Sequence, residues 1–239
     1  MLSPMSSAVT PIVQAVIFDL DGLLLDTEPI YMDATRTVLA RRRAELDTDL
    51  WWRLTGQPSL VVLRSIVEEA GLSVRAEQLL AERQMVLDRH LGRAQALPGA
   101  EQLVHQLAAD GVPIAIATSS TRRAYLMKSR QHPWLEQFDA VVTRDDVPLG
   151  KPAPDLFLEA ARRLGQPPER CLAIENASSG LRAGRAAGMT TVIVPTDGMD
   201  LEAFKDADQL LESLEQFRPA EWGLTARDTA KPVPDIAPA

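Results

Sequence analysis

In the segment AVIFDLDGLLLDTE, residues 15–28, an apolar stretch typical of a buried strand is followed directly by the first acidic residues of the chain. Four apolar residues lead directly into Asp19, and Asp21 follows two positions later. Two neighbouring carboxylates repel each other and cost several kcal/mol to desolvate unless something compensates. A bound cation is the compensation that this arrangement favours.

Short apolar runs like the first recur along the rest of the chain, at residues 113–119, 140–143, 171–175 and 191–195. They are continuous rather than alternating, which is typical of parallel strands covered on both faces. Amphipathic helical patterns separate them, at residues 100–111, 121–131, 153–165 and 178–189. This alternation predicts an α/β fold with a doubly wound, Rossmann-like parallel sheet.

Residues 29–96 break the alternation, because their pattern is helical almost throughout. We predict a helical cap domain there, inserted into a core domain of residues 12–28 and 97–225. Ligands of such sheets bind beyond the carboxyl ends of the strands, so the insertion would roof the site. The ends of the chain, residues 1–11 and 226–239, lack periodicity and are expected to be flexible tails.

The composition narrows the class of protein. With 239 residues, 46% hydrophobic and 24% charged, the chain suits a soluble globular protein with a proper core. A formal charge of -8 offers no basic face for nucleic acid or anionic lipid. The one cysteine, Cys171, rules out an internal disulfide and is expected to be a buried, inert residue. We expect a cytoplasmic protein with no signal peptide and no membrane span.

Polar and charged residues follow the other predicted strands, and the carboxyl ends of parallel strands meet at one edge of a sheet. We therefore expect them to converge with Asp19 and Asp21. These residues are Thr118, Ser119, Lys151, Glu175 and Asn176. Carboxylates, hydroxyls and a lysine suit phosphoryl transfer, in which developing charge must be neutralised and two oxygens aligned.

The two aspartates take different roles in that interpretation. Asp19 would be the nucleophile that forms an aspartyl-phosphate, with Mg2+ holding it ionised and bridging it to the phosphate. Asp21 would protonate the leaving oxygen and later activate water. Taken alone, the DLDG segment is equally well a turn after a strand. A calcium-binding EF-hand loop is excluded, because Leu23 and Ile30 occupy positions that require acidic ligands.

The remaining residues would bind the phosphate and complete the metal shell. Thr118 and Ser119 would donate hydrogen bonds to phosphoryl oxygens, and Lys151 would supply a positive charge. Glu175 and Asn176 would provide metal-binding oxygens. Simpler alternatives exist for each, since TSST also suits a helix N-cap and Lys151 also suits a solvated loop.

Four segments, FDLDGLLLDTE, IATSS, GKPAPDLF and AIENASSGLRAGRAAGM, resemble the motifs of the haloacid dehalogenase superfamily of phosphatases and mutases. The resemblance spans residues 14–224, and its nearest subgroup contains pseudouridine-5'-phosphatase and related sugar-phosphate phosphatases. It implies a helical cap after the first strand and the roles given above for Asp19 and for the phosphate ligands Thr118 and Lys151. It also implies that the backbone carbonyl of Asp21 binds Mg2+ together with positions 175 and 176.

One departure from the family pattern, and one difference from the mutases within the family, affect the expected function. Asn176 stands where the family usually has aspartate, which removes one negative charge and should weaken metal binding. This departure motivates the alternative of a non-catalytic regulator that retains the fold. Tyr31 stands at the position of a histidine in β-phosphoglucomutases, and tyrosine cannot titrate near neutrality. Tyr31 therefore favours a phosphatase over a mutase.

We expect a Mg-dependent hydrolase of a small sugar or nucleoside monophosphate, with a sugar-phosphate mutase or a regulator as the alternatives. A dinucleotide-binding dehydrogenase is excluded because the chain has no G-x-G-x-x-G segment. The loop of residues 54–60 is expected to join two cap helices, and Gln57 within it and Arg53 just before it are candidates for contacting the substrate. Equally, these two side chains could cap helices of the cap domain. The oligomeric state is not readable from the sequence.

Overall fold

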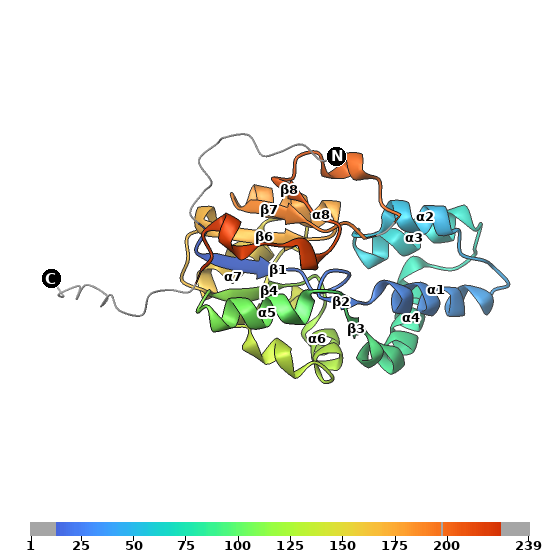
Figure 1. Cartoon of the computed structure of the whole chain (residues 1–239). Helices are drawn as coiled ribbons and strands as arrows, with labels where there is room; N and C mark the ends of the chain where they lie inside the picture. Colours follow the sequence, from blue (N-terminus) through green and yellow to red (C-terminus); the bar gives the residue numbers. More distant parts are fainter. Residues whose placement is uncertain (1–12, 197, 226–239) are drawn as a thin grey trace.

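The computed structural model of the chain describes residues 13–196 and 198–225, which form a parallel sheet with helices around it and a group of helices beside it (Figure 1). The predicted tails, residues 1–11 and 226–239, lie outside the described residues. Residue 12, the first of the predicted core domain, lies outside them as well.

Six parallel strands form the main sheet of the described residues, in the order β5-β4-β1-β6-β7-β8. Their bounds are β1 Ala15–Phe18, β4 Ile114–Ala117, β5 Ala140–Val142, β6 Cys171–Glu175, β7 Thr190–Ile193 and β8 Gln209–Leu210. The doubly wound α/β fold is thus confirmed, with all five predicted strands in place. The sixth, β8, has only two residues and is too short to give a periodic signal.

Alternate residues of β1 face opposite layers, as the period of a strand requires. Ala15 and Ile17 pack with residues of α7 and α8, whereas Val16 and Phe18 pack on the side of α5. The helices of the core domain are α5 Ala100–Ala109, α6 Arg122–Ser129, α7 Asp155–Arg163 and α8 Ser178–Ala186. Because helices cover both faces of the sheet, both sets of alternating side chains are buried, which explains why the strands are continuous apolar runs. Cys171 is buried in this core, and burial raises the pKa of its thiol to about 11.

Four helices lie between β1 and the rest of the sheet in sequence, and they pack around a hydrophobic cluster of their own. They are α1 Glu28–Ala40, α2 Thr48–Leu54, α3 Ser59–Glu69 and α4 Ala76–His90. The chain enters and leaves this cap through an antiparallel pair of short strands, β2 Leu25–Asp26 and β3 Gln95–Ala96. A loop is present where one was expected between two cap helices, within residues 54–60, and its residues 55–58 join α2 to α3.

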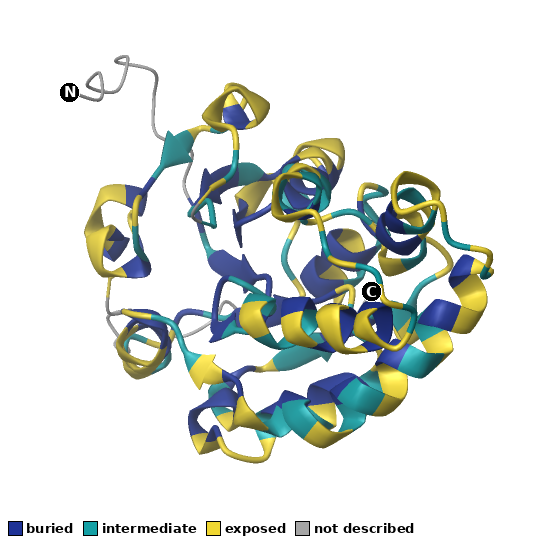
Figure 2. Cartoon of the chain, turned by 90° about the vertical axis from the view of Figure 1, so that its right-hand side faces the viewer, coloured by how far each residue is buried: buried dark blue, intermediate teal, exposed yellow. Residues whose placement is uncertain are grey.

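Short 3-10 helices complete the described structure, at η1 Leu91–Arg93, η2 Pro133–Gln137, η3 Arg144–Asp146, η4 Pro168–Arg170, η5 Leu201–Phe204, η6 Leu214–Gln216 and η7 Pro219–Trp222. Figure 2 shows the helices with buried residues along one side and exposed residues along the other. None of the helices in the described part of the chain has the length and apolar character needed to cross a membrane.

Candidate active site

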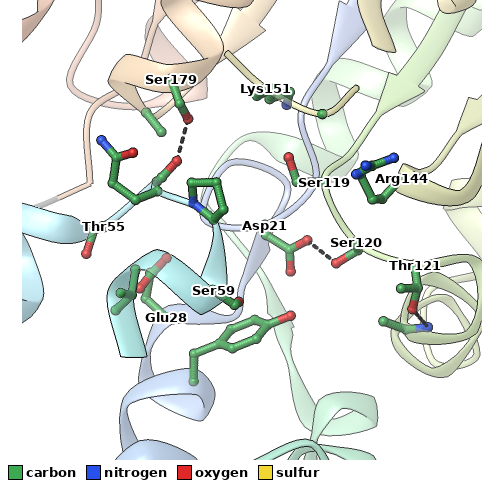
Figure 3. A pocket seen from close by; sticks show the side chains of 18 of the residues that line it. Asp21, Glu28, Thr55, Ser59, Ser119, Ser120, Thr121, Arg144, Lys151 and Ser179 are labelled. Carbon is green, nitrogen blue, oxygen red and sulfur yellow. Dashed lines mark hydrogen bonds between the residues drawn. The ribbon is translucent and has the colours of Figure 1, made fainter. Parts of the chain in front are cut away.

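A cavity of about 700 Å³ lies between the carboxyl edge of the sheet and the cap helices (Figure 3). Six of the residues predicted at the strand ends line it, together with Gln57 from the cap loop. These six are Asp19, Asp21, Ser119, Lys151, Glu175 and Asn176. The sheet edge therefore brings the predicted acidic and basic groups into one cavity.

Asp19 occupies the centre of this edge, immediately after β1. Its backbone N–H donates to the carbonyl of Ile174 in β6 at 3.0 Å, which fixes the main chain between the two strands. The Lys151 Nζ donates to its Oδ1 at 2.6 Å. Burial raises the pKa of Asp19 to about 7, the Lys151 charge opposes this rise, and the charge of Glu175 adds to it. A second cation would thus favour the ionised form that a nucleophile requires.

Lys151 links three groups at the bottom of the cavity. Besides Asp19, its Nζ donates to the Ala117 carbonyl at 2.8 Å and forms an ion pair with Glu175. Its side chain is buried, so the alternative of a solvated loop lysine is wrong. Burial alone would lower the pKa of Lys151, but its acidic neighbours Asp19 and Glu175 raise it above its ordinary value. The lysine is therefore a fixed positive charge beside Asp19.

Glu175 ends β6 and faces the first turn of α8. Its Oε2 accepts the backbone N–H of Asn176 at 3.0 Å and that of Ala177 at 3.3 Å. A Cβ on Gly180 would overlap the Glu175 carboxylate, so glycine at this position lets the helix approach. The recurrence of glycine every fourth residue predicts such packing, but Gly188 has nothing within 4 Å and ends the helix with a φ of 79°.

Asn176 is buried, and its amide is oriented by a neighbour. Its Nδ2 donates to the Thr196 Oγ1 at 3.0 Å, and a Cβ on Gly22 would collide with that nitrogen. Gly22 has a φ of 78°, which glycine adopts without strain. These contacts assign the nitrogen to the Thr196 side and leave the amide oxygen as the group available to a cation.

Thr118 and Ser119 are placed differently from one another. Ser119 lines the cavity, whereas Thr118 is fully buried and is not among the lining residues. The Thr118 hydroxyl donates to Asp21 Oδ2 at 3.2 Å and accepts from the Ser120 N–H at 3.0 Å. Its hydroxyl is thus engaged with Asp21, and the geometry does not present it to a phosphate. The N-cap alternative applies to Thr121, whose hydroxyl accepts the Ala124 N–H of α6 at 3.2 Å.

Asp21 forms an ion pair that the sequence analysis did not find. The Lys128 Nζ lies 2.5 Å and 2.7 Å from its two carboxylate oxygens, and Ser120 Oγ donates to it at 2.8 Å. Burial alone would raise the pKa of Asp21, but Lys128 lowers it below its ordinary value. One signal was available in the sequence: Lys128 follows Ala124 by four residues, and both lie on the buried face of α6.

The cap side of the cavity carries polar groups that the sequence analysis also missed. Glu28, Tyr31, Trp51 and Arg83 all line it. Arg83 is 2% exposed, its Nε is without a hydrogen-bond partner among the described residues, and its guanidinium lies 5.7 Å from the centre of the Tyr31 ring. Burial lowers the pKa of Arg83 and raises that of Glu28 to about 7, with the charge of Asp21 adding to the second effect.

The two predicted substrate contacts have separate outcomes. Gln57 lines the cavity, so the structure places it where a substrate could reach it. Arg53 is exposed and does not line the cavity, so the structure does not bring it to the predicted site. Its position near the end of α2 turns it away from the cavity that its neighbour Trp51 lines.

The predicted metal ligands meet the chemical requirement for a hard cation. Asp19 and Glu175 offer buried carboxylates, Asn176 an amide oxygen and Asp21 a backbone carbonyl, all of them oxygen donors that Mg2+ prefers. The Glu175 Oε1 accepts no hydrogen bond from the described residues, although it faces the Lys151 charge. Within residues 13–196 and 198–225, however, no three acidic, histidine or cysteine side chains gather into a metal cluster. A cation would therefore depend on the amide and backbone oxygens as well.

Comparison with known proteins places the chain in a family. Residues 13–188 match the family model described as haloacid dehalogenase-like hydrolase. The chain belongs to the haloacid dehalogenase-like hydrolases. The family resemblance drawn from the motifs is thus confirmed, and so is the expectation of an enzyme of the hydrolase class.

Relatives in this family include named phosphatases. The chain is 40% identical over 217 residues to (DL)-glycerol-3-phosphatase 2 of Arabidopsis thaliana, covering 87% of this chain and 90% of that protein. It is 36% identical to a probable pseudouridine-5'-phosphatase of Drosophila melanogaster, covering 93% and 99%. A hydrolase of the same family from Deinococcus radiodurans R1, with bound phosphate and sodium, superimposes with a TM-score of 0.74 at 31% identity, covering 90% of this chain and 98% of that one.

Proposed function

We propose that this haloacid dehalogenase-like hydrolase is a Mg-dependent phosphatase that works through an aspartyl-phosphate on Asp19. The observation that carries the proposal is the placement of Asp19 in the cavity, hydrogen-bonded to the buried Lys151 and adjacent to Glu175. A nucleophilic carboxylate, a fixed positive charge and a second acidic residue are what covalent phosphoryl transfer needs at one point. The named phosphatase relatives support the same reaction.

The first half of the reaction transfers the phosphoryl group to the protein. An oxygen of the Asp19 carboxylate attacks phosphorus, and the bond from phosphorus to the substrate oxygen breaks. Beside Lys128 the free Asp21 is a carboxylate, so it takes up a proton as the negatively charged phosphate ester binds, and it then gives that proton to the leaving oxygen. The alcohol departs neutral and Asp21 is again a carboxylate. Lys151 neutralises part of the charge on the transferring oxygens. Mg2+ bound at this edge would supply further charge neutralisation.

The second half returns the protein to its starting state. A water molecule attacks phosphorus and gives its proton to the Asp21 carboxylate. The bond between phosphorus and the Asp19 oxygen then breaks, inorganic phosphate leaves, and both aspartates are restored. Asp21 thus gives one proton and takes one back in each cycle.

The charges of the cap favour a phosphatase over a mutase. A mutase must retain a bisphosphate and therefore needs cationic groups on the cap side for the second phosphate. Among the described lining residues of the cap, Arg83 is the one cation, its charge interacts with that of Glu28, and the carboxyl of Glu77 also lines the cavity. Tyr31 lines the cavity at the position where the β-phosphoglucomutase pattern has histidine. A second phosphate would be poorly held there.

The proposed substrates are small phosphomonoesters whose alcohol carries hydroxyl groups, such as a polyol, sugar or nucleoside monophosphate. Relatives named as acting on glycerol 3-phosphate, pseudouridine 5'-phosphate and FMN support this class. The remaining expectations belong to the same proposal: a cap domain of residues 29–96, a core domain of residues 12–28 and 97–225, and a cytoplasmic location. A small phosphorylated metabolite is the expected partner.

The test is release of inorganic phosphate from p-nitrophenyl phosphate and from a panel of sugar, polyol and nucleoside monophosphates, with and without MgCl2. The wild type should turn over several of these only with the metal, and Asp19→Asn should be inactive while retaining the wild-type circular dichroism spectrum. β-Glucose 1-phosphate with catalytic 1,6-bisphosphate tests the mutase alternative. Formation of glucose 6-phosphate faster than any release of phosphate would overturn the proposal, and an inert wild type would favour the non-catalytic regulator.

A further inference from the structure

Lys128 is a fully buried lysine whose charged end is directed at a single carboxylate. Its Nζ lies within 2.7 Å of both oxygens of Asp21 and 2.7 Å from the Ser120 Oγ. The side chain is 0% exposed, and it extends from α6, a helix of the core domain. The lysine therefore joins α6 to the loop that follows β1.

Packing does not account for a charged residue at this position. Desolvating an ammonium group costs several kcal/mol, and an apolar residue of similar volume would often fill the same space at no loss of stability. Lys128 also does not line the cavity, whereas its partner Asp21 does. Any effect of the lysine on a substrate must therefore pass through Asp21.

Three side chains donate hydrogen bonds to the Asp21 carboxylate. Lys128, Ser120 and Thr118 all direct hydrogen atoms at it, and Ser120 and Thr118 come from the loop between β4 and α6. Figure 3 shows Asp21 at the cavity with Ser120 beside it. A carboxylate held this way has little freedom to rotate, which is an advantage for a group that must exchange a proton in a fixed direction.

We propose that Lys128 is a positioning residue for Asp21, holding its carboxylate in line with the leaving oxygen. The inference rests on the proposed phosphatase function. After the proton has passed from Asp21 to the leaving oxygen, the lysine holds the resulting carboxylate in place, and the water of the second half gives its proton to the same group. The ammonium itself neither gains nor loses a proton.

This role predicts a dependence on the leaving group that general damage to the fold would not produce. An alkoxide such as that of glycerol 3-phosphate needs a proton in order to leave, whereas p-nitrophenolate leaves without one. General acid catalysis contributes about 10²- to 10⁴-fold. Lys128→Met should therefore lower kcat/KM for glycerol 3-phosphate by about 100-fold, and for p-nitrophenyl phosphate by less than about 10-fold.

The experiment compares kcat/KM for the two substrates in the wild type, Lys128→Met, Asp21→Asn and the double variant, at saturating MgCl2. Because Lys128 acts through Asp21, the double variant should be no slower than Asp21→Asn alone. Lys205→Met, which removes an exposed lysine at the end of η5, is the matched control and should behave as wild type. Lys128→Gln, which keeps a hydrogen-bond donor without the charge, serves if the methionine variant does not fold.

The possible results distinguish a failure of the positioning role of Lys128 from a failure of the proposed phosphatase activity. Equal losses for both substrates, or a double variant much slower than Asp21→Asn, would overturn the positioning role while leaving the phosphatase intact. Wild-type rates in Lys128→Met would overturn it as well. A wild type that releases phosphate from neither substrate overturns the proposed function, and the inference falls with it.

Discussion

Gly180 lies so close to Glu175 that a Cβ at position 180 would overlap the Glu175 carboxylate. The contact joins the first turn of α8 to the last residue of β6, and it keeps the acidic group between the helix and Lys151. The absence of a side chain at Gly180 thus determines where the Glu175 carboxylate, a predicted metal ligand, is held.

Gly180→Ala should therefore displace the Glu175 carboxylate. We expect destabilisation of about 1–3 kcal/mol from overpacking, together with a large loss of Mg-dependent phosphatase activity. Gly184→Ala is the matched control, because its Cβ would press on Ala173 and Thr191 at 3.0–3.1 Å, away from the cavity. Thermal unfolding and a Mg2+ titration of activity measure the two effects. An alanine at position 180 that loses stability but keeps the wild-type Mg2+ dependence would show that Glu175 has no part in binding the cation.

Asn176→Asp should tighten the binding of Mg2+ by adding a negative charge to the oxygen donors. Without metal, the new carboxylate lies next to Glu175 and the two negative charges repel, so the variant should unfold at a lower temperature than wild type. The Thr196 hydroxyl, which accepts from the amide in the wild type, can rotate and donate to the carboxylate. With MgCl2, the rise in unfolding temperature should exceed that of wild type, because a ligand stabilises in proportion to its affinity for the folded state.

Asn176→Ala is the control for that comparison, since it removes the amide oxygen without adding charge. It should show a smaller rise in unfolding temperature with MgCl2 than wild type. Equal rises in all three proteins would mean that position 176 does not face the cation.

The sheet could be predicted because its strands are continuous apolar runs that end in polar residues. Asp19 and Glu175 lie at strand ends and Lys151 lies in the loop that follows β5, and parallel strands bring such positions to one edge. That they share an edge follows from the parallel sheet that the alternation of elements predicts, whereas the order of the strands, which places β1 between β4 and β6, was not predicted.

Residues on the helices could not be predicted in the same way. Arg83 lies within a helical pattern in which charged residues are ordinarily solvated, and nothing local indicates that tertiary packing buries it. For Lys128 the only local signal is its spacing from Ala124, and Glu28 stands at the very start of α1, outside the predicted cap. The orientation of the Thr118 hydroxyl was likewise unpredictable, because it depends on Asp21 nearly a hundred residues earlier in the chain. Arg53 was predicted to contact the substrate but lies outside the cavity. Its closeness to the loop in sequence does not determine which way a helical side chain points.

Glu28→Gln should change how stability depends on pH. Burial raises the pKa of Glu28 to about 7 in the folded protein, whereas an unfolded chain binds the proton only below about 4.5. Between these values the folded state holds more protons, so this group makes the protein less stable as pH rises. A neutral glutamine removes that penalty, and each pKa unit corresponds to about 1.4 kcal/mol before screening by solvent.

We therefore expect Glu28→Gln to match wild type near pH 4 and to exceed its stability by about 1–2 kcal/mol near pH 7. Urea unfolding at pH values from 4 to 8 measures the difference. Glu45→Gln, on the exposed segment after α1, is the control, and its difference in unfolding free energy from wild type should not change across this pH range. A Glu28→Gln variant whose advantage stayed constant or shrank as pH rose would contradict the raised pKa.

Arg83→Met should weaken the recognition of the leaving group without harming the transfer itself. Arg83 is the buried cation on the cap side of the cavity, and its Nε has no hydrogen-bond partner within residues 13–196 and 198–225. It is therefore placed to donate hydrogen bonds to hydroxyls of the substrate. Losing a charged hydrogen bond of about 1.5–3 kcal/mol corresponds to about 10- to 100-fold in kcat/KM. This loss should appear for glycerol 3-phosphate and sugar phosphates, whereas p-nitrophenyl phosphate, which has no such hydroxyls, should react within about threefold of the wild-type rate.

Arg53→Met is the control for Arg83, because it removes an exposed guanidinium that lies on the cap but outside the cavity. It should leave both kinds of substrate unaffected. If Arg53→Met lowered kcat/KM for the hydroxyl-bearing substrates while Arg83→Met did not, the cap would have to move on binding, since only a rearrangement of α2 could bring Arg53 into the cavity that Arg83 lines here. Equal losses on p-nitrophenyl phosphate in Arg83→Met would instead mean that the buried guanidinium supports the fold of the cap.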